Sequence, residues 1–345
     1  MTDLTLQLQE QAREAIATGT PLNIVGGGSK VGLGRNPQGQ AISLADHTGV
    51  ISYSPTELVI QVRAGTKVSD INAILAENQQ RLIFEPPTFD DQATIGGTIA
   101  ANQSGPCRPW FGGARDSVLG VGLINGNAEH LQFGGQVMKN VAGFDVSRSQ
   151  VGAMGSLGVM TEVSLKVLPV FESEVTLVSA MDVTQVLLAM PQFFRRNLPV
   201  TAVSHWQGKL YVRLQGSAAG VDSAAKSIEG DLLDEDSAAI WWQQVREAKV
   251  LKLTSEQVLW RTNVAATDRH VMCTEDCFLN WGGAQRWQLG AGDSGPEGAV
   301  QYLGGDRNNE VNGRLSSVAQ KLQSKLKTAF DPHGVFNPGR LYSWM

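Results

Sequence analysis

The stretch Leu22–Arg35 reads LNIVGGGSKVGLGR, a short apolar run followed by a glycine-rich loop. Several successive backbone N–H groups that point into one concavity bind anions. Glycine permits the φ values that such a loop needs and removes the Cβ that would hold a ligand away. Ser29 adds a hydroxyl donor and Lys30 adds a positive charge. The loop Gly26–Lys30 therefore suits a phosphate or a pyrophosphate.

The known classes of phosphate loop have a different spacing. A Walker loop needs Gly-Lys followed by Ser or Thr, whereas here Lys30 follows Ser29. The dinucleotide fingerprint G-x-G-x-x-G starting at Gly26 would need a glycine where Val31 stands, and a helix directly afterwards. Instead, more glycines and the strand-like AISL (41–44) follow. We expect a loop between two strands, and taken alone it fits a glycine-rich hairpin turn without ligand equally well.

A second stretch of small residues, TIGGTIAAN (Thr94–Asn102), favours the ligand interpretation. Small side chains over nine residues let the chain lie directly against a large flat ligand or its phosphate-bearing tail. Gly105, Gly112 and Gly113 extend that surface. A structural turn does not need two separated platforms of this kind, whereas a ligand as long as FAD does.

Composition bounds the class of protein. The 345 residues are 42% hydrophobic and 18% charged, which is typical of a soluble globular protein with one large or two medium domains. The formal net charge of −5 and the scattered basic residues exclude a nucleic-acid footprint. No apolar run approaches the ~20 residues that span a bilayer. The N-terminal stretch 1–16 lacks the basic start and apolar core of a signal peptide.

The chain has three cysteines, Cys107, Cys273 and Cys277. A small and odd number of cysteines argues against a disulfide framework. They indicate a reducing compartment, and we expect a cytoplasmic protein. Cys273 and Cys277 raise the question of a metal, but no histidine or third cysteine lies near them at ligand spacing. We therefore expect ordinary buried thiols and no metal site.

Hydrophobic periodicity predicts an α+β fold. In the first part of the chain the patterns predict helices at 4–16 and 69–78, strands at 21–25, 58–64, 81–84 and 159–167, and a hairpin that turns at Asn125-Gly126. The pattern of the sequence changes after Pro169, where longer strand-like and helix-like runs begin. The second part predicts strands at 174–180, 258–264, 277–283, 286–291 and 299–305, a hairpin at 200–216, and helices at 183–196, 218–229, 240–251 and 315–326. We expect this part to be an antiparallel α+β domain with its helices on one face.

Several longer stretches resemble one family of flavoproteins. They are GGGSK (26–30), PTELVIQVRAGT (55–66), EPP (85–87), TIGGTIAAN (94–102), RPWFGGARDSVLG (108–120), FGGQVMKNVAGFDVSR (133–148), GSLGVMTEVSLKVLP (155–169) and FDPHGVFNPGRL (330–341). The chain resembles the vanillyl-alcohol oxidase and p-cresol methylhydroxylase (PCMH) superfamily over nearly its whole length. More closely, it is similar to the FAD-binding subunits of bacterial glycolate oxidases.

The resemblance implies a fold and a cofactor. The fold is a PCMH-type FAD-binding domain of two α+β subdomains at residues 1–172, an antiparallel α+β cap or partner domain at 173–325, and a segment at 326–345 that returns to the FAD domain. The resemblance also implies that the pyrophosphate lies on the glycine loop and that other segments line the rest of FAD. The implied cofactor-binding residues are Gly26, Gly27, Gly28, Ser29, Lys30, Pro87, Thr88, Thr94, Gly96, Gly97, Ala100, Asn102, Gly105, Gly158, Val159 and Asn337.

The chain departs from its relatives in two respects. Some members tether FAD covalently through a histidine or a cysteine, but the phosphate loop here has no histidine and Cys107 is the one local alternative. We expect noncovalent FAD. Related D-2-hydroxyacid dehydrogenases carry clustered histidines that bind a metal at the substrate. Here the histidines are isolated, and they are His47, His130, His205, His270 and His333.

Oxidation of a 2-hydroxy acid needs a cation for the carboxylate and a group that removes the hydroxyl proton. No histidine is a convincing base, so the catalytic residue is unknown from the sequence. Arg108, Arg115 and Lys139 are weak candidates for the cation, as is Arg148, because they fall in the motif segments. The alternative is that they form surface ion pairs or neutralise the FAD phosphates.

Three functions remain open from the residues. The first is the FAD-binding subunit of a glycolate (2-hydroxyacid) oxidase complex, working beside a sister FAD-containing catalytic subunit and an iron–sulfur subunit that accepts electrons. The second is a self-sufficient FAD-dependent 2-hydroxyacid dehydrogenase. The third is a structural subunit that retains the flavoprotein fold. The substrate would be a small 2-hydroxy acid, nucleic acid is not expected as a partner, and any membrane attachment would come through partner subunits.

Overall fold

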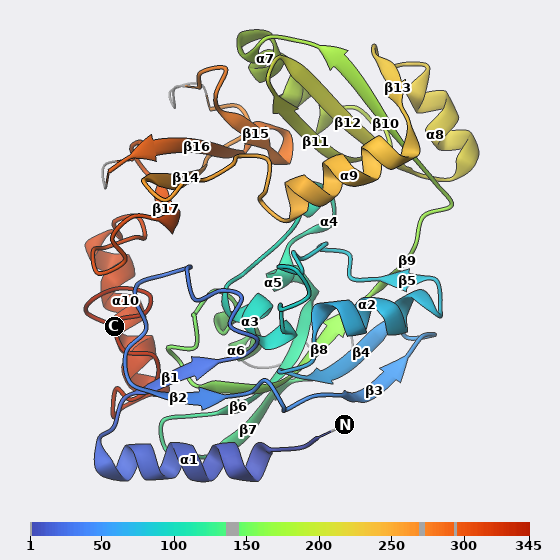
Figure 1. Ribbon diagram of the computed structural model, residues 1–345. Coiled ribbons are helices and arrows are strands. Elements are labelled where there is room, and N and C mark those ends of the chain that lie inside the picture. The colour runs from blue at the N-terminus through green and yellow to red at the C-terminus, as the bar shows by residue number, and fades with distance from the viewer. Residues whose placement is uncertain (1, 136–144, 269–272, 293–294) are drawn as a thin grey trace. The chain divides into compact units, whose positions relative to one another are not determined.

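The computed structural model describes residues 2–135, 145–268, 273–292 and 295–345 (Figure 1). The chain divides into two compact units. The first unit comprises Met1–Gln103, Ala114–Pro169 and Arg307–Met345, and the second comprises Ser104–Gly113 and Val170–Asp306. The chain thus leaves the first unit twice before its C-terminal part returns to it. The domain limits 1–172, 173–325 and 326–345 stay a prediction.

An antiparallel sheet of five strands forms one layer of the first unit. In spatial order its strands are β3 (Val50–Ser54), β4 (Val59–Arg63), β8 (Val159–Lys166), β6 (Val118–Ile124) and β7 (His130–Gly134). The helices α2 (Val68–Ala76) and α3 (Ile95–Ala100) bury their apolar residues in the same core as the residues of β4, β6 and β8. Since side chains alternate along a strand, these helices cover one face of the sheet.

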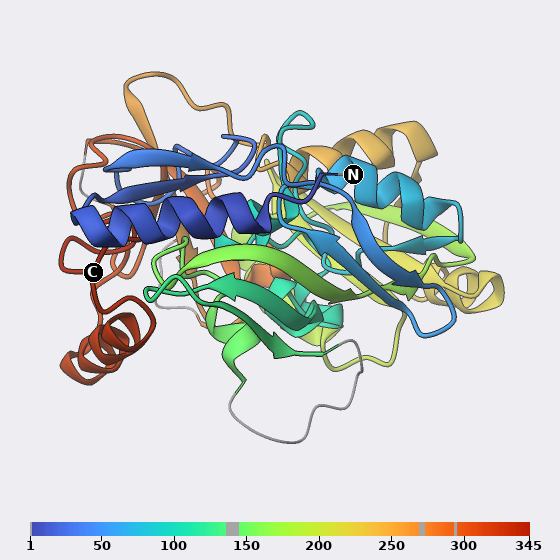
Figure 2. The same cartoon turned by 90° about the horizontal axis from the view of Figure 1, so that it is seen from below.

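A second, smaller layer of the first unit contains the glycine loop. The strands β1 (Leu22–Val25) and β2 (Gln40–Ser43) pair in parallel, and α1 (Thr5–Thr18) lies along them (Figure 2). Leu8 and Ala12 of α1 pack with Ile42 and with Phe336 from the C-terminal part. The remaining elements of this unit are β5 (Gln80–Arg81), β9 (Leu168–Pro169), α5 (Ala114–Ser117), α6 (Val146–Ser149) and α10 (Ser317–Phe330).

The second unit is built on an antiparallel sheet of eight strands. Their spatial order is β13 (Asp231–Leu233), β10 (Ser173–Ala180), β12 (Lys209–Gly216), β11 (Val200–Trp206), β15 (Phe278–Asn280), β16 (Gln285–Ala291), β14 (Gln257–Asn263) and β17 (Val300–Gly304). Its helices are α4 (Arg108–Phe111), α7 (Val183–Phe193), α8 (Ala218–Ala225), α9 (Glu235–Arg246) and the short 3-10 turn η1 (Trp281–Gly283).

Helices cover both faces of this sheet, so the expectation of helices on one face is wrong. The apolar residues of α7 and α8 pack with Leu177 and Val212 of the sheet. On α9, the Trp242 indole N–H donates to the Thr176 hydroxyl at 2.8 Å, and Trp241 stacks on Tyr211. Thr176 and Tyr211 alternate with the residues that face α7 and α8, and therefore point to the opposite face. Trp241 and Trp242 therefore form the sheet-facing side of the amphipathic helix α9. Their indole N–H groups need polar partners there.

Most predicted elements are present, and four differ. The strand predicted at 277–283 is wrong beyond Asn280, where the 3-10 turn η1 begins, and the helix predicted at 240–251 begins at Glu235 and ends at Arg246. The strand predicted at 81–84 is wrong beyond Arg81, because Leu82 and Phe84 are buried in a loop that packs into the core before the double proline. The hairpin of β6 and β7 is present but turns over five residues, with the positive φ at Ala128 rather than at Asn125-Gly126. Among the residues described, no helix is long and apolar enough to cross a bilayer.

Candidate functional site

Two adjoining cavities form one groove in the first unit. The cavity at the glycine loop has a volume of about 100 Å³, and the second has about 70 Å³. Residues that line both are Ile24, Gly26, Thr94, Gly97, Ala100, Met154 and Asn337. The groove therefore extends over both cavities, and most of its walls come from four segments that are far apart in the sequence. These segments are the glycine loop, the start of α3, the stretch before β8 and the C-terminal part.

The glycine loop connects two parallel strands, so the hairpin-turn alternative is wrong. A Cβ on Gly27 would lie 1.9 Å from the Gln92 carbonyl oxygen, and one on Gly26 would lie 2.3 Å from the Thr94 Oγ1. Gly28 has a φ of +74° and open space where a Cβ would be. The first two glycines therefore let the loop pack on the protein, whereas Gly28 shapes the backbone next to the groove.

The second small-residue segment packs against the glycine loop. Thr94 caps α3, because its Oγ1 accepts a hydrogen bond from the Gly97 N–H. Gly96 lies against Ala64, where an added Cβ would come within 2.7 Å of the Ala64 Cβ. The small residues thus bring a helix turn, a strand end and the loop into one wall, and any larger side chain would separate them.

The C-terminal part completes the groove through Asn337. Its backbone has a φ of 42°, and its side-chain amide bridges two other walls. The Asn337 Oδ1 accepts from the Ile24 N–H at 2.7 Å, and the Nδ2 donates to the Met154 carbonyl. One buried amide therefore ties β1, the stretch before β8 and the C-terminal part together.

A buried ion pair holds this C-terminal part in place. The Lys327 Nζ donates to the Asp331 Oδ2 at 2.7 Å and to the carbonyls of Ser156 and Phe336, each at 2.8 Å. The Asp331 carboxylate accepts from the N–H groups of Val335 and Phe336. Each charge is therefore surrounded by hydrogen-bond partners, which is the condition under which a buried pair is tolerated.

The electrostatics of the groove favour an anion. Arg340 donates to the carbonyls of Lys30 and Val31 at 3.1 and 3.0 Å and to that of Arg35. Burial lowers the pKa of Arg340 to about 10, so it stays charged at neutral pH. The Lys30 ammonium lies 3.1 Å from the Ser29 Oγ and over the ring of Phe89. No acidic residue occurs among the described residues that line the two cavities.

The predicted cofactor residues divide into those that line the groove and those that do not. The lining residues are Gly26, Gly27, Gly28, Ser29, Lys30, Thr94, Gly96, Gly97, Ala100, Gly158 and Asn337. Pro87, Thr88, Asn102 and Val159 belong to the first unit but line neither cavity. Gly105 belongs to the second unit, where its carbonyl accepts from the Trp281 indole N–H at 2.9 Å. Their predicted contacts with the cofactor stay a prediction.

Several lining residues escaped the sequence reasoning. They are Asn23, Ile24, Val25, Val31, Pro37, Leu44, Ala64, Gln150, Met154, Gly155 and Met160, whereas Ala101 and Arg340 lie in the quoted stretches 94–102 and 330–341. Gly155 opens the quoted stretch GSLG, so that motif was a usable signal. The others are apolar or polar residues of ordinary type, and nothing in a single sequence distinguishes them from core or surface.

The weak basic candidates are not gathered at the groove. Arg115 lies exposed on α5, and the half-buried Arg148 pairs with Asp145 at 3.2 Å. Arg108 belongs to the second unit, where its guanidinium lies 4.5 Å from the centre of the Trp281 ring. Lys139 lies outside the described residues. Arg108, Arg115 and Arg148 line neither cavity.

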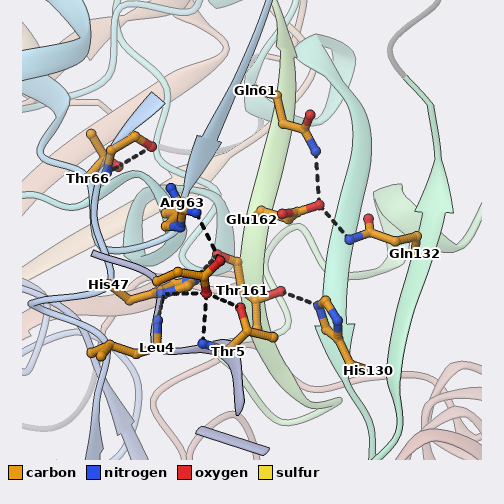
Figure 3. Close-up of polar contacts among 12 residues, drawn as sticks. Leu4, Thr5, His47, Gln61, Arg63, Thr66, His130, Gln132, Thr161 and Glu162 are labelled. Atoms are coloured by element: carbon orange, nitrogen blue, oxygen red, sulfur yellow. Dashed lines mark hydrogen bonds and ion pairs between the residues drawn. The ribbon is translucent and has the colours of Figure 1, made fainter. Parts of the chain in front are cut away.

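Two histidines of the first unit have structural partners (Figure 3). The His47 Nδ1 accepts from the Leu4 N–H at 3.0 Å, and its Nε2 lies 2.9 Å from the Thr161 carbonyl, so the proton sits on Nε2. Burial lowers the pKa of His47 and keeps it neutral. The His130 Nε2 lies 3.0 Å from the Thr161 Oγ1. The part of the chain that the structure describes contains no group of three or more potential metal ligands.

Comparison with known proteins identifies the family. A family profile described as an FAD binding domain matches residues 5–134. Glycolate oxidase subunit GlcE of Escherichia coli is 37% identical over 347 residues, which cover 99% of this chain and 98% of that protein. The chain belongs to the FAD-linked oxidase family. Its cofactor is FAD, and the anion-binding groove, with its glycine backbone and two cations, fits a dinucleotide with a pyrophosphate.

Other members of the FAD-linked oxidase family match over part of the chain. A D-lactate dehydrogenase of Anaerostipes hadrus is 29% identical over 54% of this chain and 38% of that protein. Glycolate oxidase subunit GlcD of Bacillus subtilis is 31% identical over 41% of this chain and 30% of that protein. Among solved structures, an alkyldihydroxyacetonephosphate synthase superposes with a TM-score of 0.68 at 13% identity. It covers 96% of this chain and 74% of that protein, and at this identity it shows the fold alone.

Proposed function

We propose that the chain is the FAD-binding subunit of an oxidase complex that converts glycolate, a 2-hydroxy acid, to glyoxylate. The full-length similarity to glycolate oxidase subunit GlcE carries the proposal. When bound, FAD accepts the hydride equivalent that leaves the carbon bearing the hydroxyl group. This chain's own part is to hold the cofactor. Lys30 and the backbone of Gly26–Ser29 bind the pyrophosphate, and Arg340 and Asn337 keep that backbone in position.

The partners in this proposal are a sister FAD-containing subunit and an iron–sulfur subunit. The sister subunit binds and oxidises the hydroxy acid, and the iron–sulfur subunit accepts the electrons. Two observations on this chain support the division of labour. Neither cavity has a histidine or a carboxylate among its described lining residues, so a proton-removing group is missing there. Nor do the described residues contain a cluster that could bind a metal at the substrate.

A self-sufficient dehydrogenase is the second candidate, and one observation in the second unit favours it. The Arg261 guanidinium lies 5.0 Å from the centre of the Tyr302 ring and 5.8 Å from that of Trp287. Its pKa is lowered by burial and, to a smaller extent, by the positive charge of Arg108. The Arg261 Nε is buried without a hydrogen-bond partner among the described residues. Two neighbouring cations of this kind favour a carboxylate between them.

The decisive experiment uses the purified chain alone. Visible flavin absorption after purification, or after addition of FAD to the colourless protein, separates a flavoprotein from a purely structural subunit. Anaerobic addition of glycolate or D-lactate then separates the two enzymatic candidates. We expect the flavin of the isolated chain to stay oxidised and that of the assembled complex to bleach. Bleaching of the isolated chain would establish the self-sufficient dehydrogenase instead.

A variant in the second unit gives an independent decision between the two candidates. In the assembled complex, Arg261→Gln leaves the KM for glycolate unchanged if the sister subunit binds the substrate. If this chain binds the carboxylate, the loss of one charged hydrogen-bond donor raises KM by about tenfold or more. The exposed Arg195→Gln, in the same unit, is the matched control for a general effect of removing a positive charge.

A further inference from the structure

Cys273 and Cys277 lie side by side in the second unit. A tight turn brings them together, because the Cys277 N–H donates to the Thr274 carbonyl at 3.0 Å. The Cys277 thiol donates to the Cys273 sulfur, with 3.5 Å between the two Sγ atoms. Both are free cysteines, and both belong to the described residues. Two sulfurs in van der Waals contact need to approach by only about 1.5 Å to reach bonding distance.

The two thiols differ in their access to solvent. Cys277 is fully buried and belongs to the apolar core formed with Leu279 and Met190. Cys273 is half-buried at the edge of the same core. A reagent from solvent therefore reaches Cys273 first, while Cys277 is held behind it at a distance that allows it to react next. This is the arrangement of an attacking and a resolving cysteine.

Charge and hydrogen bonding activate the more exposed thiol. The hydrogen bond from Cys277 lowers the pKa of Cys273, burial opposes this, and the nearby Arg286 guanidinium lowers it further, to about 7. The hydrogen bond to Cys273, together with burial, raises the pKa of Cys277. Cys273 therefore forms a thiolate more readily than an ordinary cysteine, whereas Cys277 keeps its proton. A thiolate is the nucleophile in thiol oxidation.

We propose that Cys273 and Cys277 form a reversible redox pair that hydrogen peroxide oxidises to an intrachain disulfide. The Cys273 thiolate attacks one peroxide oxygen, the O–O bond breaks, and hydroxide leaves and takes a proton from solvent to become water. Cys273 is then a sulfenic acid. The Cys277 sulfur attacks the Cys273 sulfur, the S–O bond breaks, and the hydroxyl leaves as water with the Cys277 proton. Two thiols have lost two electrons, and one peroxide has become two waters.

The test uses the full-length purified protein and hydrogen peroxide as the probe. After mild treatment at neutral pH we expect the loss of two titratable thiols per chain and their recovery with dithiothreitol. Trypsin cuts after Arg269 and Arg286, so one peptide contains both cysteines. Without reduction, this peptide should be lighter by two hydrogen atoms than after reduction. The alkylation rate of Cys273 before oxidation should rise with pH around a midpoint below the ~8.5 of an ordinary cysteine.

Two variants assign the roles. In Cys277→Ser the reaction should stop at Cys273, giving a sulfenic acid that dimedone traps, while Cys273→Ser should resist oxidation. The buried Cys107→Ser is the matched control and should behave like the wild type. Two outcomes would overturn the proposal. One is a sulfinic acid on Cys273 with Cys277 still reduced in the wild type, and the other is equal thiol loss in Cys273→Ser. The peptide measurement on the wild type decides the matter even if a variant fails to fold.

Discussion

The glycine loop Gly26–Lys30 and the C-terminal segment 327–340 contribute to the same groove, and they do so by opposite means. The loop contributes backbone, and its first two glycines are small because the protein itself comes within 2.3 Å of where a Cβ would stand. The C-terminal segment contributes long polar side chains. Lys327, Asp331, Asn337 and Arg340 make hydrogen bonds inside the protein rather than with solvent.

This difference has a physical lesson. A loop without side chains has no means of fixing its own conformation, because glycine has the largest backbone entropy of any residue. The shape of the anion site must therefore be imposed from outside. Arg340 imposes it by donating to the carbonyl of Lys30 and to those of Val31 and Arg35, which follow the loop. The Lys327–Asp331 pair holds the segment from which Arg340 projects. Cofactor affinity should thus depend on hydrogen bonds made within the protein as well as on direct contacts with the cofactor.

The largest effect should follow from removal of the buried lysine. Lys327→Met leaves the Asp331 carboxylate without its cation and the carbonyls of Ser156 and Phe336 without a donor. Loss of one partner of a buried pair costs about 3–5 kcal/mol. We expect the first unit to unfold at markedly lower urea concentration, and FAD to dissociate in the same range.

Lys325→Met is the matched control for this prediction, since Lys325 is exposed on the same helix α10. It should lie within about 0.5 kcal/mol of the wild type. Equal urea midpoints for the two variants would show that the C-terminal segment is held by other contacts.

A pair of alanine substitutions separates the two uses of glycine in the loop. In Gly27→Ala the new Cβ would meet the Gln92 carbonyl at 1.9 Å, and both segments must shift. Overpacking of this kind costs about 1–3 kcal/mol, so FAD affinity should fall by about 10- to 100-fold. Gly28→Ala meets no atom and only strains a φ of +74°, which costs about 1 kcal/mol.

Titration of the apoprotein with FAD, followed by the change in flavin fluorescence, measures both affinities. If Gly28→Ala proved the more harmful variant, the open space beside Gly28 would belong to the cofactor rather than to solvent. The pyrophosphate would then approach the loop most closely at Gly28.

The difference between loop and segment also explains what the sequence could predict. Glycine clusters such as Gly26–Gly28 and Gly96-Gly97 are visible in a single sequence because few other structures require them. Lys327 and Asp331 occur on an amphipathic helix and just after it, where charged residues normally face solvent. Their burial results from the return of the C-terminal part against the stretch before β8, a contact between distant segments. The same holds for Met154 and Gln150, whose residue types carry no signal.

The predicted helices and strands show the same distinction between local sequence signals and contacts between distant segments. Strongly periodic segments such as β8 and α10 appear where the patterns place them. The wrong strand at 82–84 is an apolar run that packs as a loop, because tertiary burial, rather than strand pairing, explains its hydrophobic residues. In the second unit, alternation located the strands but not the helix that covers each face. Both faces of the sheet carry buried side chains, and a linear pattern does not say which helix meets which face.

A smaller effect should follow from Arg340→Lys. The guanidinium donates to the carbonyls of Lys30, Val31 and Arg35 at once, and an ammonium group cannot reproduce this planar fork. Leaving one or two carbonyls unpaired costs about 1–2 kcal/mol. We expect FAD affinity to fall by about tenfold while the fold is retained.

Circular dichroism checks the fold of Arg340→Lys, and FAD titration gives its affinity. Arg314→Lys, at an exposed position of the same C-terminal part, should leave the affinity unchanged. An unchanged affinity in Arg340→Lys would mean that a single charge beside the loop, rather than the fork of hydrogen bonds, is what the site requires.

The smallest effect concerns pH and compares a buried histidine in each unit. Burial lowers the pKa of His47 in the first unit and of His205 in the second below the ordinary value of 6.5. Nearby Asp3 and Glu162 partly oppose this at His47, as do Glu275 and Asp182 at His205, while Arg63 reinforces it at His47. The unfolded chain therefore binds protons first as pH falls below about 6.5. Stability from both residues is present above that pH and decreases below it, by at most about 1.4 kcal/mol per pH unit for each histidine.

Urea unfolding between pH 7 and pH 5, followed separately by flavin release and by tryptophan fluorescence, tests this assignment. His47→Gln should flatten the pH dependence of flavin release, because FAD leaves with the first unit. His205→Gln should flatten that of the tryptophan signal, since seven of the eight tryptophans, all except Trp344, belong to the second unit. The exposed His333→Gln should change neither slope. Identical slopes in all three variants would mean that the acid sensitivity comes from carboxylates, and that the two buried imidazoles bind protons as readily in the folded protein as in the unfolded chain.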